Sequence, residues 1–396
     1  MSKGTIFVLA ASRYQVPVIQ TARQLGYRVI TTDNIASNPG HRLADRSYAI
    51  DTTDLQAVSD IARCEKINGI IAACTDVAVP TMAYVAKQLN LPGISPTCAQ
   101  VACNKIAFRQ FLQHHGFPCP DFYIITSSSK PDPGLFQHTK WVLKPDQSSG
   151  SKGVFIVNSI ADFYKYLPDT LSFSPHQRGI LEIFIDGVQG TCEGVIQNRR
   201  LAATFLLDRQ TLSQPYSTTC GHRLPSNLTS DLQERLLADL QKIWHLLGVV
   251  DSPFDCDFVA TKTDIYILEL SPRIGGNSIT NLLQQAAGFD LIEYSIKLAC
   301  RESARLPQAT SIRPAAIILF GVSSEGYLDY DAIEFEALRK EAWVNSISLD
   351  LKRGDPVYPF RNSRYRVGEA LIFGEDRADL DRKAEELQKR LQLRAT

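Results

Sequence analysis

Short apolar runs alternate with amphipathic segments along the first third of the chain. The apolar runs predict strands at residues 5–10, 28–32, 47–50 and 69–73, and the amphipathic segments predict helices at residues 16–25, 55–64, 77–89 and 104–116. Strands that alternate with helices in this way are typical of a parallel sheet with helices on both faces. The first strand is not followed by Gly-x-Gly-x-x-Gly, so the glycine fingerprint of dinucleotide-binding domains is absent.

The pattern becomes mixed after Pro118 and Pro120. Strands are predicted at residues 141–145, 154–157 and 180–185 and within 257–276, a hairpin at 190–207, and helices at 229–247, 279–287, 291–300 and 379–391. The α/β pattern followed by an α+β pattern predicts three domains. They are an N-terminal parallel α/β domain at residues 1–120, a central domain at 121–305 with two lobes that meet near 182–187, and a small C-terminal α+β domain at 306–396. Residues 304–310 are the predicted linker.

Composition favours a protein that acts on small molecules. The 42 basic and 42 acidic residues balance and form no long basic block, which argues against a nucleic-acid partner. No apolar run approaches the ~20 residues of a membrane span, and the N-terminal run is too short for a secretion signal. The nine cysteines are odd in number and include no Cys-x-x-Cys pair, so neither a disulfide framework nor a zinc knuckle is predicted. We therefore expect a cytoplasmic protein without a membrane partner.

Two adjacent strands between residues 257 and 276 carry several polar side chains. Because side chains alternate faces along a strand, Glu269, Ser271 and Arg273 share one face. Asp257, on the neighbouring strand, can project from that face as well. Carboxylate oxygens suit Mg²⁺, and the arginine fork suits a phosphate or a carboxylate. The segment therefore indicates a site for a metal-bound polyphosphate, and the alternative is a hairpin with an acidic outer face.

A lysine and a loop of small residues follow one another after residue 143. Lys144 lies at the end of a strand, and the loop residues of interest are Ser148, Ser149, Gly150, Ser151 and Gly153. Glycines let backbone N–H groups turn toward an anion and serine hydroxyls add donors, so such a loop can close over phosphates. The alternative is an exposed hairpin turn, but the carboxylates later in the chain favour phosphate binding.

Residues 180–187 form an apolar strand that is interrupted by one acid, Glu182. At the junction of two lobes, the backbone of Glu182, Ile183, Phe184 and Ile185 can offer the donor, the acceptor and the apolar slot that an adenine needs. The alternative is that Glu182 is simply the outward position of an alternating strand.

Candidates for substrate binding carry weaker signals. His222 and Arg223 form a basic pair ahead of a helix and can meet a substrate carboxylate, or they can lie in an exposed loop. Gly276 and Asn277 precede a helix N-terminus, where free N–H groups can bind an anion or simply be capped. Arg364 and Arg366 can reach the site from the last domain, or they can lie on a solvated strand edge.

These motifs together resemble those of ATP-grasp enzymes over nearly the whole chain. The resemblance implies that Lys105 and Lys144 bind the nucleotide, that the loop at 148–153 covers its phosphates and that residues 182–185 contact adenine. The central domain would then have the ATP-grasp fold. Gln189 departs from the pattern, since the family often has a ribose-binding acid at this position.

The same resemblance assigns the metal and catalytic residues. It implies that Asp257, Glu269 and Ser271 hold the metal, although the family commonly has Asn where Ser271 stands. It also implies that Arg273, together with Lys144, acts on the γ-phosphate or on the substrate carboxyl group during catalysis.

The family suggests a reaction and its partners. We expect an ATP-dependent carboxylate–amine ligase similar to the L-amino acid ligases, which forms an amide or peptide-like bond through an acylphosphate and releases ADP and phosphate. ATP and Mg²⁺ (or Mn²⁺) would be its cofactors, small-molecule carboxylates and amines its partners, and a homodimer one compatible assembly. The alternatives are a bicarbonate-using carboxylase, similar to biotin carboxylase or the aminoimidazole ribonucleotide carboxylases, and a nucleotide-binding regulatory protein without turnover.

Overall fold

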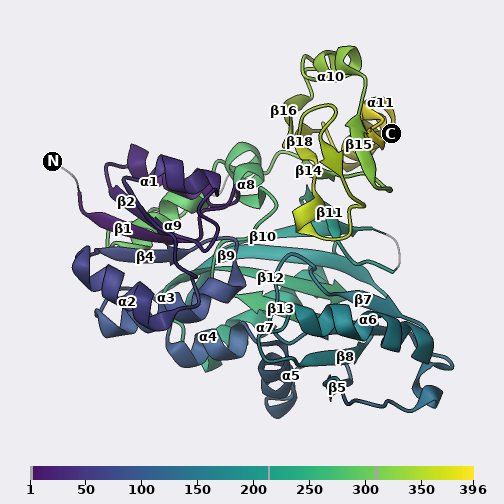
Figure 1. The fold of residues 1–396 in the computed structure, drawn as a ribbon, viewed down its shortest axis with the longest axis horizontal. Helices are drawn as coiled ribbons and strands as arrows, with labels where there is room; N and C mark the ends of the chain where they lie inside the picture. The colour runs from purple at the N-terminus through teal and green to yellow at the C-terminus, as the bar shows by residue number, and fades with distance from the viewer. Residues whose placement is uncertain (1–2, 213–214, 308–310) are drawn as a thin grey trace.

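The computed structural model describes residues 3–212, 215–307 and 311–396, and its N-terminal region is a parallel sheet between helices (Figure 1). The sheet has the order β3-β2-β1-β4, formed by β1 (Thr5–Leu9), β2 (Arg28–Thr32), β3 (Arg46–Tyr48) and β4 (Gly69–Ala72). Its helices are α1 (Val16–Gln24), α2 (Leu55–Cys64) and α3 (Val79–Gln88). Ile6 and Val8 pack with α1, whereas Phe7 and Leu9 pack with α2 and α3, because successive side chains of a strand point to opposite faces. The predicted α/β region is confirmed.

A small antiparallel sheet forms one lobe of the central region. Its order is β5-β8-β6-β7, from β5 (Phe122–Ile125), β6 (Trp141–Pro145), β7 (Phe155–Val157) and β8 (Gly179–Ile183). Helix α6 (Ile160–Ser172) covers it through Phe163 and Leu167. The sequence pattern predicted neither β5 nor α6.

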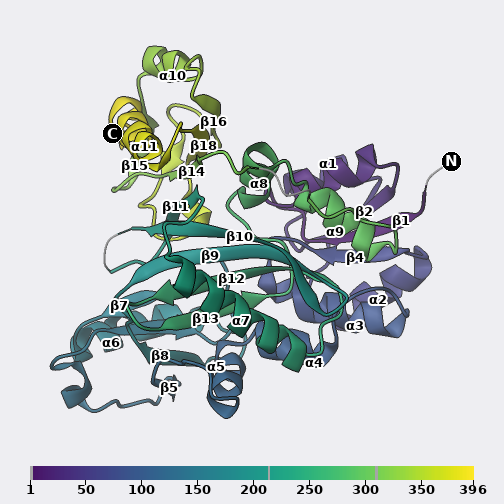
Figure 2. The same cartoon turned by 180° about the vertical axis from the view of Figure 1, so that it is seen from behind.

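The other lobe and the C-terminal region share one antiparallel sheet (Figure 2). Its order is β13-β12-β9-β10-β11-β14-β18-β16, from β9 (Val188–Gln197), β10 (Arg200–Thr211), β11 (Thr219–Leu224), β12 (Ser252–Ala260), β13 (Ile265–Ser271), β14 (Ala315–Phe320), β16 (Val344–Leu349) and β18 (Gly368–Phe373). Gly221 of β11 is paired with Ile318 of β14, so the sheet is continuous across the predicted boundary at residues 305 and 306. The exact domain boundaries stay predictions, and residues 308–310 of the predicted linker lie outside the described residues.

The remaining elements complete the three regions. They are α4 (Pro96–Ala102), α5 (Lys105–His114), α7 (Ser230–Leu246), α8 (Ile279–Ala287), α9 (Leu291–Ala299), α10 (Ala332–Leu338), α11 (Arg377–Leu391), β15 (Gly326–Asp329), β17 (Pro356–Val357) and β19 (Arg394–Ala395), with short 3-10 turns at Pro39–Leu43, Asp76–Ala78, Pro133–Phe136 and Ser363–Tyr365. Helix α9 packs against α1 and β4, which joins the central region to the N-terminal sheet. Within the described ranges, no helix is long and apolar enough to cross a membrane.

Candidate active site

A cavity of about 780 Å³ lies where the three regions meet. Seventeen of the candidate residues from the sequence line it, namely Lys105, Lys144, Ser148, Ser149, Gly150, Ser151, Glu182, Ile183, Phe184, Ile185, His222, Asp257, Glu269, Arg273, Gly276, Asn277 and Arg364. Four others, Gly153, Arg223, Ser271 and Arg366, do not line it. The cavity therefore brings together most of the predicted site.

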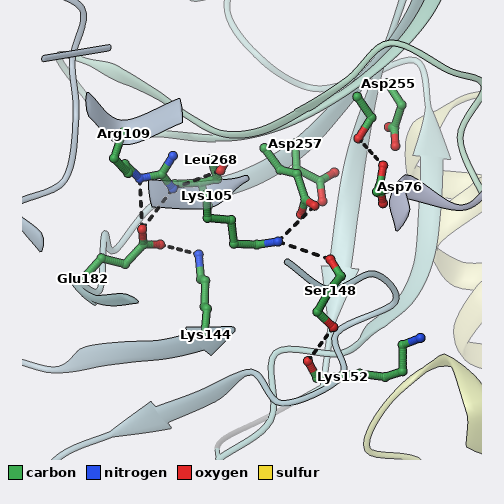
Figure 3. A network of polar contacts seen from close by, with 12 residues as sticks. Asp76, Lys105, Arg109, Lys144, Ser148, Lys152, Glu182, Asp255, Asp257 and Leu268 are labelled. Atoms are coloured by element: carbon green, nitrogen blue, oxygen red, sulfur yellow. Dashed lines mark hydrogen bonds and ion pairs between the residues drawn. The ribbon is translucent and has the colours of Figure 1, made fainter. Parts of the chain in front are cut away.

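One end of the cavity holds the hinge network, which we define as Glu182, Lys144 and Arg109 (Figure 3). The Glu182 carboxylate forms an ion pair with Lys144 and accepts a hydrogen bond from Arg109 Nε at 3.0 Å. Arg109 also donates to the carbonyl oxygen of Leu268 at 2.9 Å, and it is fully buried. Burial opposes ionisation, but the charges of Arg109 and Lys144 hold the pKa of Glu182 below its usual range. Burial lowers the pKa of Lys144.

Two of the backbone N–H groups beside this network already donate hydrogen bonds within the protein. The N–H groups of Ile183 and Phe184 donate to the carbonyl oxygens of Asp121 at 3.0 Å and Lys140 at 2.9 Å. Among the described residues, the Ile185 N–H has no hydrogen-bond partner. Ile185 is therefore the backbone donor that this segment offers to a base in the cavity.

The glycine–serine loop lies against two other regions of the protein. Lys105 Nζ donates to the Ser148 carbonyl oxygen at 3.3 Å, and the Gly150 carbonyl oxygen accepts from Ser363 N at 3.1 Å. Gly150 has a φ of +68°, and a Cβ there would lie 2.2 Å from Ser363 Oγ. Gly153, at φ +72°, packs beside Phe173, so it shapes the loop and does not line the cavity.

The two carboxylates predicted to bind metal face each other across neighbouring strands. Asp257 of β12 is the register partner of Glu269 of β13. Asp257 Oδ1 accepts from Thr191 Oγ1 at 2.7 Å, and Asp257 Oδ2 lies 3.5 Å from Arg209 Nη1. Glu269 Oε1 lies 3.2 Å from Lys105 Nζ. Within the described residues no group of three or more His, Cys, Asp or Glu side chains is arranged to hold a metal.

Ser271 does not occupy the position that the sequence predicted. Its hydroxyl donates to Asp76 Oδ1 at 2.6 Å, and the side chain is 2% exposed. Asp76 comes from the N-terminal region and covers this part of the strand, so Ser271 contacts Asp76 and not the cavity. Its predicted role as a metal ligand is therefore not supported.

The other end of the cavity holds the acidic network, which we define as Arg273, Asp76, Asp255 and Glu193. Arg273 donates from Nε and Nη2 to Asp76 at 2.9 Å each, and from Nη1 to Asp255 at 2.6 Å. Burial opposes ionisation of Asp76, but the charge of Arg273 lowers its pKa. Burial raises the pKa of Asp255 to about 7.

Glu193 is the least compensated member of the acidic network. It is fully buried and is the register partner of Asp255. Neither of its carboxylate oxygens has a hydrogen-bond partner among the described residues. Burial and then the charge of Asp255 raise the pKa of Glu193 well above its usual range. Arg273 thus contacts two of the three carboxyl groups of this network, Asp76 and Asp255.

The predicted basic pair on β11 is divided between the two faces of the sheet. His222 lines the cavity at 2% exposure, and neither ring nitrogen has a partner among the described residues. Burial lowers the pKa of His222 to about 4, so the ring is neutral near pH 7. Arg223 faces away and lies 2.8 Å from Asp381 of α11. The expectation that both residues contact substrate is corrected for Arg223, because strand neighbours point to opposite faces.

Several residues of the site were not predicted from the sequence. They are Asp76, Arg109, Thr191, Glu193, Arg209 and Asp255. Asp255 stands two residues before Asp257, so strand alternation alone places it on the same face. Asp76 follows β4, and ligands of parallel sheets bind beyond the carboxyl ends of strands. For Arg364 the sequence allowed either a position at the site or a solvated strand edge. In the structure Arg364 lines the cavity.

Comparisons with known proteins agree with this geometry. Residues 102–277 match the family model described as the ATP-grasp domain. An uncharacterized protein, y4rH, of Sinorhizobium fredii is 27% identical over 96% of this chain and 78% of its own length. The formate-dependent phosphoribosylglycinamide formyltransferase of Paraburkholderia xenovorans is 24% identical over 94% of this chain and 91% of its own length.

A solved structure shares the whole fold. The crystal structure of an L-amino acid ligase from Bacillus licheniformis superposes with a TM-score of 0.81 at 17% identity, covering 100% of this chain and 99% of that one. At this identity the likeness concerns the arrangement of helices and strands.

Proposed function

Because this chain contains an ATP-grasp domain at residues 102–277, we propose that it is an ATP-dependent carboxylate–amine ligase. The observation that carries the proposal is the composition of one cavity. Lys105, Lys144 and Arg209 supply positive charge, Asp257 and Glu269 supply oxygen ligands, and all five side chains line it. The hinge backbone lies at the same cavity, so a nucleotide can extend from the hinge to the carboxylates.

The charges suit a triphosphate. Two unit charges about 4 Å apart interact by about 4 kcal/mol at an effective dielectric constant near 20, so a triphosphate beside a substrate carboxylate needs compensating cations. Lys105 and Lys144 belong to two different elements, α5 and β6, and both line the cavity. We propose that they bind the phosphates while the loop at residues 148–153 covers them.

The donor set fits Mg²⁺ or Mn²⁺. Mg²⁺ is usually bound through one or two carboxylates together with phosphate oxygens and water, and Asp257 and Glu269 provide two adjacent carboxylates. We propose these two residues as the ligands, without Ser271. When bound, the ion neutralises charge on the phosphates and so favours attack on phosphorus.

The proposed reaction has two steps. A substrate carboxylate oxygen attacks the terminal phosphorus of ATP, the bond from this phosphorus to the bridging oxygen breaks, and ADP leaves with the electron pair. The amine nitrogen then attacks the acyl carbon, inorganic phosphate leaves with the electrons of the broken carbon–oxygen bond, and the nitrogen releases its extra protons to solvent. Lys144 compensates charge on the phosphates. Arg273 orients the carboxylate from the acidic network.

The acidic network and His222 indicate where the substrates bind. Asp76, Asp255 and Arg273 line the cavity, and His222 presents to it two ring nitrogens that have no partner among the described residues. We propose that His222, Gly276 and Asn277 contact the amino-acid substrate. The fold shared with an L-amino acid ligase supports an amino acid as the carboxylate. The nine cysteines are free, which agrees with a cytoplasmic location, and a homodimer is the proposed assembly.

The test is Mg²⁺-dependent release of ADP and phosphate from three mixtures. They contain ATP with pooled amino acids, with formate and pooled amines, or with bicarbonate and pooled amines, and the products are identified by mass spectrometry. We expect release with amino acids and a product lighter by one water than its two parents. Release only in the mixture that contains bicarbonate would identify the protein as a carboxylase. Nucleotide binding without turnover in all three mixtures would identify it as a regulatory protein.

A matched pair of variants links the activity to the site. Glu269→Gln removes a proposed metal ligand and should lower kcat/KM by about 100-fold or more, the usual size for loss of a charge-stabilising group. Glu293→Gln, on α9 beside Lys297, carries the same chemical change and does not line the cavity. It should behave as the parent, and equal activity of the two variants would exclude the metal assignment.

A further inference from the structure

Each of the two carboxylates proposed to bind metal already faces a cation. Glu269 lies 3.2 Å from Lys105 Nζ, and Asp257 lies 3.5 Å from Arg209 Nη1. Lys105 belongs to the family pattern, whereas Arg209 does not, and no ligand has been assigned to it. Both cations line the same cavity as the carboxylates. A metal ion bound to Asp257 would therefore meet the positive charge of Arg209.

Arg209 is held in place by neutral partners and keeps donors for a ligand. Its Nε donates to Thr219 Oγ1 at 2.8 Å, and its Nη1 donates to Gln189 Oε1 at 3.3 Å. The side chain is 11% exposed, and Gln189 and Thr219 line the cavity beside it. Within the described residues, Nη2 donates no hydrogen bond. A guanidinium with free N–H groups in this position matches the geometry of phosphate oxygens.

The strand register explains why Arg209 reaches the cavity. Arg209 of β10 is the register partner of His222, which also lines it. Its neighbour Asp208 points to the other face and forms an ion pair with Arg377 at 2.7 Å. Arg209 therefore belongs to the ATP-facing side of the sheet.

On the basis of the proposed function, we propose that Arg209 binds the terminal phosphate of the nucleotide. This contact couples nucleotide binding to metal binding. Without nucleotide, Arg209 and Lys105 compensate Asp257 and Glu269 and oppose a second cation there. With nucleotide, the terminal phosphate accepts hydrogen bonds from Arg209, and Asp257 becomes available to the metal. The metal and the triphosphate each bind more tightly when the other is present, as thermodynamic linkage requires.

Binding measurements test this without the carboxylate or amine substrates. Mn²⁺ binding is followed by electron paramagnetic resonance with no nucleotide, with ADP and with adenylyl imidodiphosphate, a non-hydrolysable ATP analogue. The variants are Arg209→Gln, Arg209→Lys and the control Arg223→Gln, which removes an arginine from the opposite face of the same sheet. Circular dichroism verifies that each variant is folded.

The parent should bind Mn²⁺ at least about tenfold more tightly with the analogue than without nucleotide, and ADP should give a smaller gain. Arg209→Gln should bind Mn²⁺ alone more tightly than the parent and should lose most of the additional gain that the analogue gives over ADP. Arg209→Lys should retain part of that gain because it keeps the charge. Arg223→Gln should match the parent.

The inference is wrong if Arg209→Gln keeps the full difference between the analogue and ADP, or if Arg223→Gln loses it equally. If the parent protein binds neither Mn²⁺ nor the analogue, the proposed function itself is refuted. The two failures are therefore distinguishable in one experiment.

Discussion

The two ends of the cavity handle buried charge in opposite ways. In the hinge network, one carboxylate, Glu182, is shared by two cations, Lys144 and Arg109. In the acidic network, one cation, Arg273, serves Asp76 and Asp255, and the buried Glu193 beside them has no hydrogen-bond partner among the described residues. The hinge network thus has surplus positive charge. The acidic network has more carboxyl groups than cations, and the pKa values of Asp255 and Glu193 are raised.

This difference indicates which ligand each end accepts. Surplus positive charge stabilises phosphates, so the hinge end and the adjacent Lys105 suit the nucleotide. Surplus carboxylate suits an ammonium group, so the acidic end suits the amine substrate. Figure 3 shows the order along the cavity, with Glu182 and Lys144 at one end, Lys105 and Asp257 between, and Asp76 and Asp255 at the other. The charge distribution therefore agrees with a ligase that joins a phosphorylated carboxylate to an amine.

Removing Arg273, the single cation of the acidic network, should destabilise the protein most. Arg273→Met leaves Asp76 and Asp255 without their partner, and breaking a buried ion pair costs about 3–5 kcal/mol of unfolding free energy. Arg109→Met should cost less, because Glu182 keeps Lys144. Urea denaturation of both variants measures the difference. An equal or larger loss for Arg109→Met would contradict the contrast between the two ends.

The second effect is kinetic and belongs to the hinge network. Lys144→Met removes a cation proposed to compensate the phosphates and should lower kcat/KM for ATP by about 100-fold. Lys165→Met, on α6 and outside the cavity, is the control. Steady-state kinetics at several ATP concentrations separate the two variants. A normal kcat/KM for Lys144→Met would show that this lysine only pairs with Glu182 and does not compensate the phosphates.

Asp255 and Glu182 should respond oppositely to pH. Asp255 has a folded pKa of about 7, above its unfolded value, so the folded state binds the extra proton and unfolding free energy falls as pH rises toward 7. The slope for one proton is at most about 1.4 kcal/mol per pH unit. The pKa of Glu182 is lowered, so its contribution is lost as pH falls below its unfolded value.

Urea midpoints measured from pH 4 to pH 8 test this contrast. Asp255→Asn should flatten the decline on the neutral side and leave the acid side unchanged. Glu182→Gln should flatten only the acid side. If Asp255→Asn left the neutral decline intact, the assignment of that titration to the acidic network would be incorrect.

The smallest effect concerns the loop between the two ends. Gly150→Ala places a Cβ 2.2 Å from Ser363 Oγ at a φ of +68°, so the loop must shift. A left-handed non-glycine residue costs about 1 kcal/mol, and we expect KM for ATP to rise a few-fold with little change in kcat. Gly248→Ala also lies at positive φ and has open space around it. It should cost stability without changing KM for ATP.

The sequence predicted the hinge end far better than the acidic end. Lys144, the loop at 148–153 and the carboxylates Asp257 and Glu269 are recognisable because each lies in a short strand–loop or strand–strand motif. The strands and helices of the N-terminal sheet were recognisable for the same reason, since their periodicity is local. Contacts between segments that are distant in the sequence could not be predicted in this way.

Two contacts illustrate that limit. Asp76 reaches Arg273 across 197 residues of sequence, and Arg109 reaches Glu182 across 73. Neither pairing follows from periodicity or spacing, because each depends on how the domains pack. The same packing covers Ser271, which the family resemblance had placed among the metal ligands. It also continues the central sheet into the C-terminal region, a strand pairing that the local pattern did not predict.

In the proposed reaction, a substrate carboxylate is activated by the terminal phosphate of ATP before an amine displaces that phosphate. The most direct measurement supplies the amino-acid pool with heavy oxygen in its carboxylates and examines the released phosphate and the product by mass spectrometry. We predict that one heavy oxygen appears in each phosphate and that the other remains in the amide. Unlabelled phosphate released together with ADP would contradict it, because water would then have attacked the nucleotide.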